Sequence, residues 1–385
     1  MAVNLTNADS VLKSYYLDAV TEQLNNSVSP FLAAIEKTSQ DVYGKEIRKL
    51  VTYGLNEGVG AGTEDGDLPV STGNKYAQFV TTLKNLYGVI EISDKAIRAS
   101  ENNSGAFVSL LNAEMDGLLK ASKNNFGRML FGNGRGYLAT IKSVDGNTVT
   151  VDDSSKLYDN QIVDVCDDFG VLIHKNVKID KVLADNQICS YNSNIPICME
   201  GYKFVYRGAL DNEITGLEAI FSEENLYGLD KSQNPWLKPV IEEDVGEISE
   251  ETIQTVLDKI EEKSGNQPNF IVCSWGVRRA LIKLFSQNKR VVDTMELKGG
   301  FKAMSYNGIP IVVDRFCPKG TMYLLNTNDF AIYQLCDWEW LQGDDGRILK
   351  QVSGKPVYTA TLVKYADLLC SCPCGQGKIT GITEA

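Results

Sequence analysis

The sequence predicts an α+β protein in which helices and strands occupy separate stretches of the chain. Three observations support this prediction: two strand-like segments around a long acidic loop, one helical stripe of about 27 residues, and a later block of short alternating strands. With 385 residues, of which 43% are hydrophobic, the chain is long enough for two or three domains.

The composition argues against several classes of protein. No apolar run approaches the roughly 18–20 residues of a membrane span, and the start MAVNLTNADS lacks the basic and apolar regions of a secretion signal. Nine cysteines, scattered and odd in number, fit reduced thiols in a cytoplasm better than a disulfide framework. With 50 acidic and 38 basic residues the net charge is −12, so we expect only weak, local contact with nucleic acid and no membrane contact.

The first strand-like segments, 45–54 and 76–93, are rich in β-branched and aromatic residues and flank a loop as the arms of a hairpin would. The loop, YGLNEGVGAGTEDGDLPV at 53–70, holds five glycines and four carboxylates. The carboxylates disfavour a phosphate cradle, because they would repel the anion. A calcium site is possible in principle, although the spacing departs from that of a calcium-binding loop. A solvated flexible loop is favoured over a calcium site, and an arm that reaches outside its own domain stays open as a third interpretation.

A long amphipathic helix is predicted from about residue 104 to residue 130. Its apolar positions recur at i, i+3, i+4 and i+7, which places them on one face of roughly 40 Å of helix. Gly132 is expected to end this helix, because glycine readily adopts the positive φ of a C-terminal cap. The stripe consists of Phe107, Leu110, Leu111, Met115, Leu118, Leu119, Ser122, Phe126, Met129 and Leu130.

The region from 136 to 207 has the short, alternating strands and turn residues of a small all-β insertion. Beyond it, Ser249 is expected to cap a helix that ends at Gly265. A buried strand at 270–274 leads into a second helix, and the last hundred or so residues are mostly strands. The second helix is expected to place Val277, Leu281, Leu284 and Phe285 inward, and Arg278, Arg279 and Lys283 outward.

Sequence motifs that suggest catalysis occur here without the other motifs or residues that catalysis would need. The Asp-Phe-Gly triplet at 168–170 has no other kinase motif with it and is interpreted as a strand end and turn. His174 is the only histidine and has no recognisable nucleophile beside it. Cys370, Cys372 and Cys374 are predicted to be incidental thiols of a terminal strand, since alternate strand residues point to opposite faces. A zinc site, a thiol enzyme and exposed-thiol cross-linking stay open for these cysteines. We predict no catalytic residue, cofactor or metal.

The order of several segments resembles the major capsid proteins of tailed bacteriophages, which share the HK97-like fold. These segments are the hairpin tip GVGAGTEDGDLP, the predicted long helix, GALDNEITGLEAIF, FIVCSWGVRRALIKLF, YNGIPIVVDRF and GTMYLLNTNDFAIYQL. The resemblance implies a fold with an N-terminal arm (1–44), an E-loop hairpin (45–91) and a P-domain segment with the spine helix (92–135). It further implies the all-β insertion domain (136–207), an A-domain (208–328), and a P-domain sheet with the C-terminus (329–385).

The resemblance also implies a function. The E-loop tip would lie across a neighbouring subunit, with its apolar Leu-Pro pair in a groove of that neighbour. This tip comprises Glu57, Gly60, Gly62, Glu64, Asp65, Leu68 and Pro69. Charge contacts between subunits would involve Glu242, Glu243, Asp244, Arg278, Arg279 and Lys283. A solvated face is the alternative interpretation of both charged segments.

The expected protein is a non-enzymatic major capsid protein that self-assembles through hexamers and pentamers into an icosahedral shell around double-stranded DNA. It would assemble in the host bacterial cytoplasm and reside in the virion. Its expected partners are other copies of itself, a separate scaffolding protein, a portal, a decoration protein and weakly bound DNA. An encapsulin-like nanocompartment is the alternative with the same fold. Covalent cross-linking is not assigned, although Lys75 and Lys84 are available.

Overall fold

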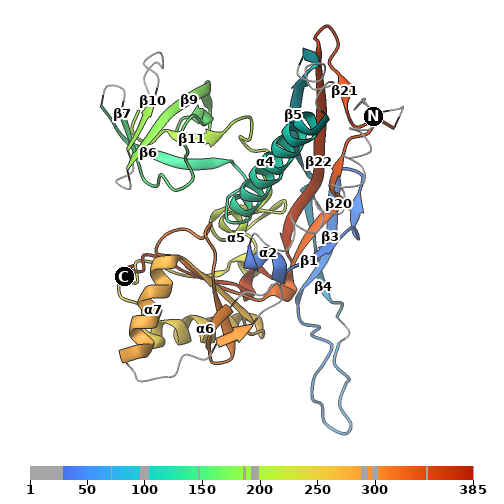
Figure 1. The fold of residues 1–385 in the computed structure, drawn as a ribbon. Helices are drawn as coiled ribbons and strands as arrows, with labels where there is room; N and C mark the ends of the chain where they lie inside the picture. The colour runs from blue at the N-terminus through green and yellow to red at the C-terminus, as the bar shows by residue number, and fades with distance from the viewer. Residues whose placement is uncertain are drawn as a thin grey trace. The chain divides into compact units, whose positions relative to one another are not determined.

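The structure is a computed structural model (Figure 1), and it forms two compact units, residues 1–127 with 223–385 and residues 128–222. In the N-terminal arm the sequence also predicts one amphipathic stretch, carried by Val11, Tyr15, Leu17, Val20 and Leu24, and this stretch lies outside the described residues. Among the described helices, none is long and apolar enough to cross a membrane. The described residues are 29–70, 72–95, 104–145, 148–184, 188–191, 199–287, 294–296, 302–343 and 346–384.

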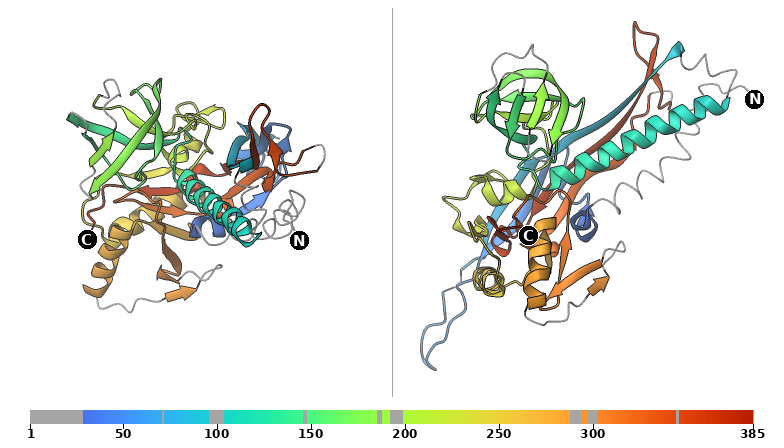
Figure 2. Two further views of the ribbon diagram at one scale, coloured as in Figure 1. Left: turned by 45° about the horizontal axis from the view of Figure 1, so that its top comes forward. Right: turned by 60° about the vertical axis from the view of Figure 1, so that its left-hand side comes forward.

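The first unit contains a five-stranded sheet built around two long antiparallel strands, β20 and β22. Helix α4 (Ser104–Leu130) matches the predicted long helix, and Figure 2 shows it running along this sheet. Leu118 of α4 lies against Gly88 of β5, and the Phe126 ring meets that of Trp338 edge-on at 6.3 Å. The strands are β1 (Glu36–Thr38), β20 (Phe330–Trp340), β22 (Val357–Cys370), β21 (Lys350–Gln351) and β5 (Lys84–Ser93).

The predicted hairpin is present, but its second arm divides into two strands. β3 (Glu46–Gly54) pairs with β4 (Lys75–Thr82), and β2 (Val42–Tyr43) lies on the other side of β3. After Leu83 the chain leaves this sheet, and β5 pairs with β22 instead. In β5 every second residue is buried, as expected for a strand with one face on a core.

A seven-stranded mixed sheet forms the second core of this unit, with α6 (Glu250–Ser264) and α7 (Trp275–Gln287) packed on it. β23 lies between β14 and β19, so residues 377–379 belong to this sheet rather than to the sheet of residues 329–370, with which the sequence groups them. In order across the sheet, the strands are β14 (Val240–Glu242), β23 (Gly377–Ile379), β19 (Met322–Leu325), β15 (Phe270–Cys273), β18 (Ile309–Val313), β17 (Lys302–Tyr306) and β16 (Thr294–Glu296).

Helix α6 begins and ends where the sequence predicts. The Ser249 hydroxyl accepts a hydrogen bond from the Thr252 N–H at 3.0 Å, and Gly265 adopts a left-handed φ of 71°. The buried face of α6 consists of Ile253, Val256, Leu257 and Ile260. The remaining short elements of this unit are α2 (Pro30–Ala34), β12 (Asn225–Leu226), β13 (Leu229–Asp230), η1 (Pro235–Leu237), η2 (Thr327–Asp329) and η3 (Pro373–Gly375).

The second unit contains a closed six-stranded barrel, as the all-β insertion predicts, together with α5 (Leu217–Ser222). A buried ion pair between Arg128 and Glu213 joins the end of α4 to the segment after the barrel. Gly132 does not adopt the positive φ expected of it. Instead, Gly216 is the position that requires glycine, because a Cβ on Gly216 would lie 2.4 Å from the Gly132 carbonyl oxygen. Around the barrel the strands are β10 (Ile188–Tyr191), β7 (Thr148–Val151), β6 (Tyr137–Asp145), β11 (Lys203–Tyr206), β8 (Ile162–Cys166) and β9 (Leu172–Ala184).

Candidate functional site

The base of the hairpin is held by stacked aromatic rings from distant parts of the chain. The Trp236 ring lies parallel to Tyr53 of β3 at 4.9 Å and to Phe79 of β4 at 6.0 Å. Phe79 also packs against Tyr227 at 5.2 Å, and the Val80 N–H donates to the Tyr227 carbonyl oxygen. Because Phe79 is fully buried, these contacts give the hairpin a fixed root.

A polar neck follows where the strands end. The Asn56 side-chain oxygen accepts hydrogen bonds from the Gly58 N–H at 2.8 Å and from the Thr72 hydroxyl at 3.3 Å. Glu57 forms an ion pair with Lys75 at 3.0 Å, and this hydrogen bond raises the pKa of Lys75. Glu57, which the sequence places at the tip, therefore lies at the neck.

Beyond the neck, the tip is a strand-free loop whose residues 59–70 are all exposed (Figure 1). A turn in which the Gly66 N–H donates to the Thr63 carbonyl oxygen at 3.1 Å shapes its end. A Cβ on Gly60 would lie 3.1 Å from the Pro69 ring, so glycine lets the two sides of the loop approach. The remaining predicted tip residues, Gly62, Glu64, Asp65, Leu68 and Pro69, all lie on this exposed loop.

The end of the hairpin, neck and tip together, exposes more apolar surface than the sequence indicates. Leu55, Val59, Leu68 and Val70 are each between 81% and 89% exposed. Large apolar side chains grouped on one loop are typical of a surface that another molecule covers. Of the four, the sequence singles out Leu68 alone. The signal for the other three is their recurrence among the glycines and acids of the loop.

The predicted charged residues are only partly brought together. Glu242 forms an ion pair with Lys259 of α6 at 2.8 Å, and Glu243 and Asp244 are exposed. On α7, the Arg278 guanidinium lies over the Trp275 ring at 6.0 Å, while Arg279 is exposed.

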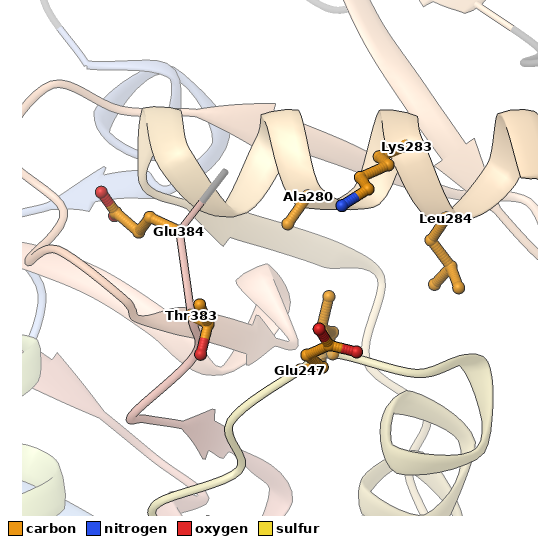
Figure 3. A pocket seen from close by; sticks show the side chains of 7 residues that line it. Glu247, Ala280, Lys283, Leu284, Thr383 and Glu384 are labelled. Atoms are coloured by element: carbon orange, nitrogen blue, oxygen red, sulfur yellow. The ribbon is translucent and has the colours of Figure 1, made fainter.

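Lys283 instead lines an open pocket of about 330 Å³ in the same chain. Figure 3 shows Lys283 above Glu247, with Thr383 and Glu384 of the C-terminal segment on the other side. The acidic segment and the basic helix thus meet at this pocket within one copy of the chain.

The motifs considered for catalysis have structural roles. The Asp167 carboxylate accepts hydrogen bonds from the Phe169 and Val171 N–H groups, and Gly170 has a φ of 82°, so the Asp-Phe-Gly triplet forms a hairpin turn. His174 pairs with Val165 within the barrel wall. Within the described ranges, no group of three or more His, Cys, Asp or Glu side chains is arranged to hold a metal ion.

The chain combines a mixed α+β fold, a long helix along a sheet, and a hairpin whose exposed apolar loop is typical of a surface that another molecule covers. The chain belongs to the SU10 major capsid protein family, which matches residues 5–346. It is therefore a phage major capsid protein, a structural protein of the virion.

Comparison with a solved capsid structure supports the same fold, and two further solved chains are similar at lower scores. A chain of the cyanophage A-1(L) capsid superposes with a TM-score of 0.58 at 15% identity, covering 93% of this chain and 95% of that chain. A capsid chain of an empty GTA particle gives 0.49 at 12% identity, covering 91% and 90%. An encapsulin from Synechococcus elongatus gives 0.47 at 10% identity, covering 95% of each chain. Curated proteins gave no match.

Proposed function

We propose that copies of this chain assemble through hexamers and pentamers into an icosahedral shell that encloses phage double-stranded DNA. Assembly takes place in the host bacterial cytoplasm. Family membership supports the role of the chain as a coat protein. The exposed apolar tip on a fixed root supports the way in which the copies join.

The observation that supports this most directly is the end of the hairpin, neck and tip together (residues 55–70), which we propose lies on a neighbouring copy. Covering a large apolar side chain contributes about 1.5–3 kcal/mol. Four such side chains therefore supply roughly 6–12 kcal/mol per contact, before the cost of ordering the loop and holding two copies together. Contacts of this size, repeated around closed rings, make a stable shell from individually modest interfaces.

The division into an E-loop (45–91), a P-domain and an A-domain belongs to the same proposal. The P-domain would contain the spine helix α4 and the β20–β22 sheet, and the A-domain the seven-stranded sheet. Because β23 lies in the seven-stranded sheet, the proposed A-domain also takes the chain end from residue 371.

Charge contacts and partners complete the proposal. Glu243 and Asp244 of one copy would face Arg278 and Arg279 of the next around the ring. A separate scaffolding protein, a portal and a decoration protein are the proposed partners. The charge of −12 fits weak, non-specific contact with the packaged DNA.

Sedimentation velocity and negative-stain electron microscopy of the protein expressed alone, and with its scaffolding partner, test this function. Wild type is expected to form rings or closed shells, and Leu68→Ser to stay as small species with an unchanged thermal melt. Phe169→Ser, an equally exposed apolar residue on the barrel, is the matched control and should assemble. A Leu68→Ser protein that assembles as well as wild type would contradict the role of the tip.

Particle contents separate a genome shell from a nanocompartment. Particles purified from infected cells are expected to protect double-stranded DNA from nuclease. Particles that instead hold a stoichiometric protein cargo and no DNA would support the encapsulin-like alternative.

A further inference from the structure

The segment that carries the chain from the β20–β22 sheet to the seven-stranded sheet contains an unusual pair of thiols. β22 ends at Cys370, and β23 begins at Gly377. Between them the chain forms the 3₁₀ turn η3 rather than the continuous strand that the sequence predicts. The turn brings the sulfur atoms of Cys372 and Cys374 to 3.6 Å from each other, instead of placing them on opposite faces.

The backbone of this turn is held on several sides. Gln376 is fully buried, and its side-chain N–H₂ group donates to the Asp329 carboxylate at 3.0 Å and to the Cys372 carbonyl oxygen at 3.1 Å. The Gln376 side-chain oxygen accepts from the Asn326 N–H at 2.9 Å. A Cβ at position 375 would lie 3.3 Å from the Cys372 sulfur, so glycine leaves room for that thiol. The two sulfur atoms therefore face each other across the turn, at a separation that must shorten to about 2 Å for a bond to form.

We propose that Cys372 and Cys374 form a thiol-exchange site, which reacts with a low-molecular-weight disulfide and closes an intrachain disulfide across η3. Both side chains are partly exposed, so a small oxidant has access to them. Cys166, Cys273, Cys317 and Cys370 are buried, and burial raises the pKa of each of these thiols. Buried thiols of this kind are inert.

The two thiols have different parts in the reaction. The hydrogen bond from Cys372, with the Lys263 ammonium nearby, lowers the pKa of Cys374 to about 7, although burial opposes this. The same hydrogen bond, together with burial, raises the pKa of Cys372. Cys374 is therefore the thiol that reacts first at neutral pH, because the thiolate is the nucleophile.

The exchange balances without any further reactant. The Cys374 thiolate attacks one sulfur of the external disulfide and expels the other sulfur as a thiolate, which leaves a mixed disulfide on Cys374. Cys372 then loses its proton to water and attacks the Cys374 sulfur, expelling the second thiolate. One external disulfide is reduced to two thiols, and the chain loses two hydrogen atoms.

Whether the Cys372–Cys374 disulfide forms therefore depends on the redox conditions around the protein. In a reducing cytoplasm the pair stays as a dithiol, and in an oxidising medium it closes. The closed form fixes the crossover that leads into β23. This inference does not depend on shell assembly and is tested separately from it.

Oxidised glutathione is the probe for the test. Full-length protein is treated at pH 7, and its free thiols are alkylated with one reagent after unfolding. Reduction and a second reagent then label the thiols that had been oxidised. The expected result is the loss of two hydrogen atoms from the intact mass, with the second label on Cys372 and Cys374 and the first label on the other cysteines.

Two single variants identify the order of events. Cys372→Ser retains Cys374 with a hydrogen-bond donor beside it and should accumulate a glutathione adduct. Cys374→Ser should form its adduct at least about tenfold more slowly, because Cys372 is poorly ionised. The proposal is overturned if wild type retains a glutathione adduct without closing, if Cys370 carries the second label, or if the two variants react at equal rates.

Discussion

The C-terminal segment, which the sequence does not place in the seven-stranded sheet, should be essential to that sheet. Ile382 is 4% exposed within its core, and the Ile382 N–H donates to the Gly320 carbonyl oxygen at 3.0 Å. The Thr383 N–H donates to the Gly246 carbonyl oxygen at 2.8 Å, and the Glu384 carboxylate accepts from the Gly320 N–H at 2.8 Å. Replacing a buried Ile by Ala costs about 2–5 kcal/mol. We expect about 3 kcal/mol for Ile382→Ala, which lies within this range.

Hydrogen exchange followed strand by strand is the suitable assay, because a chain with two compact units need not unfold in one transition. The stability lost in Ile382→Ala should speed amide exchange in β14 and β19 by roughly a hundredfold, while the exchange rates in the barrel stay unchanged. Thr383→Ala, which alters an exposed side chain, is the control. If β14 and β19 are equally protected in wild type and in Ile382→Ala, the C-terminal segment does not stabilise the seven-stranded sheet.

Three further predictions concern the root of the hairpin, the half-buried carboxylate of Asp337 and the buried carboxylate of Asp314. Trp236→Ala removes the ring that stacks on Tyr53 of β3 and Phe79 of β4, so it should speed proteolysis of the hairpin while α6 keeps its exchange protection. Equal cleavage rates in wild type and variant would contradict this. Burial alone would raise the pKa of Asp337, but its ion pair with the buried Lys364 holds that pKa well below the usual range. The pair should therefore stabilise the fold fully above about pH 4 and less as pH falls below it, and Asp337→Asn should cost about 3–5 kcal/mol at pH 7, measured by denaturant titration. Burial raises the pKa of Asp314 to about 6, so its protonation should raise the melting temperature as pH falls from 7 to 5, and Asp314→Asn should show less of that rise.

Much of the secondary structure could be predicted from local sequence patterns. The apolar stripe predicted α4 over the residues that form it, and the Ser249 and Gly265 caps fixed both ends of α6. The turn residues and short alternations predicted the individual barrel strands, but not their order, because β11 pairs with β6 and β10 pairs with β7 across long stretches of the chain. For each of these helices and strands, the residues that determine its type and its ends lie within the element or next to it.

Features that depend on distant partners could not be predicted in this way. The arm from 76 to 93 is one continuous β pattern, and only the pairing of β5 with β22 shows why it divides at Leu83. The Trp236 stack joins the hairpin to a segment more than a hundred residues away. The same limit explains the cysteines, since the bonds of Gln376 to Asn326 and Asp329, not the alternation of residues, set the turn at η3.

A cryo-electron microscopy reconstruction of the assembled particle, with the path of residues 55–70 traced in each copy, shows directly whether the hairpin joins neighbouring subunits. We expect Leu55, Val59, Leu68 and Val70 to be covered by a neighbouring copy in hexamers and pentamers alike. Tips that stay in solvent, or that fold back onto their own chain, would contradict the proposal that this hairpin joins the subunits of the shell.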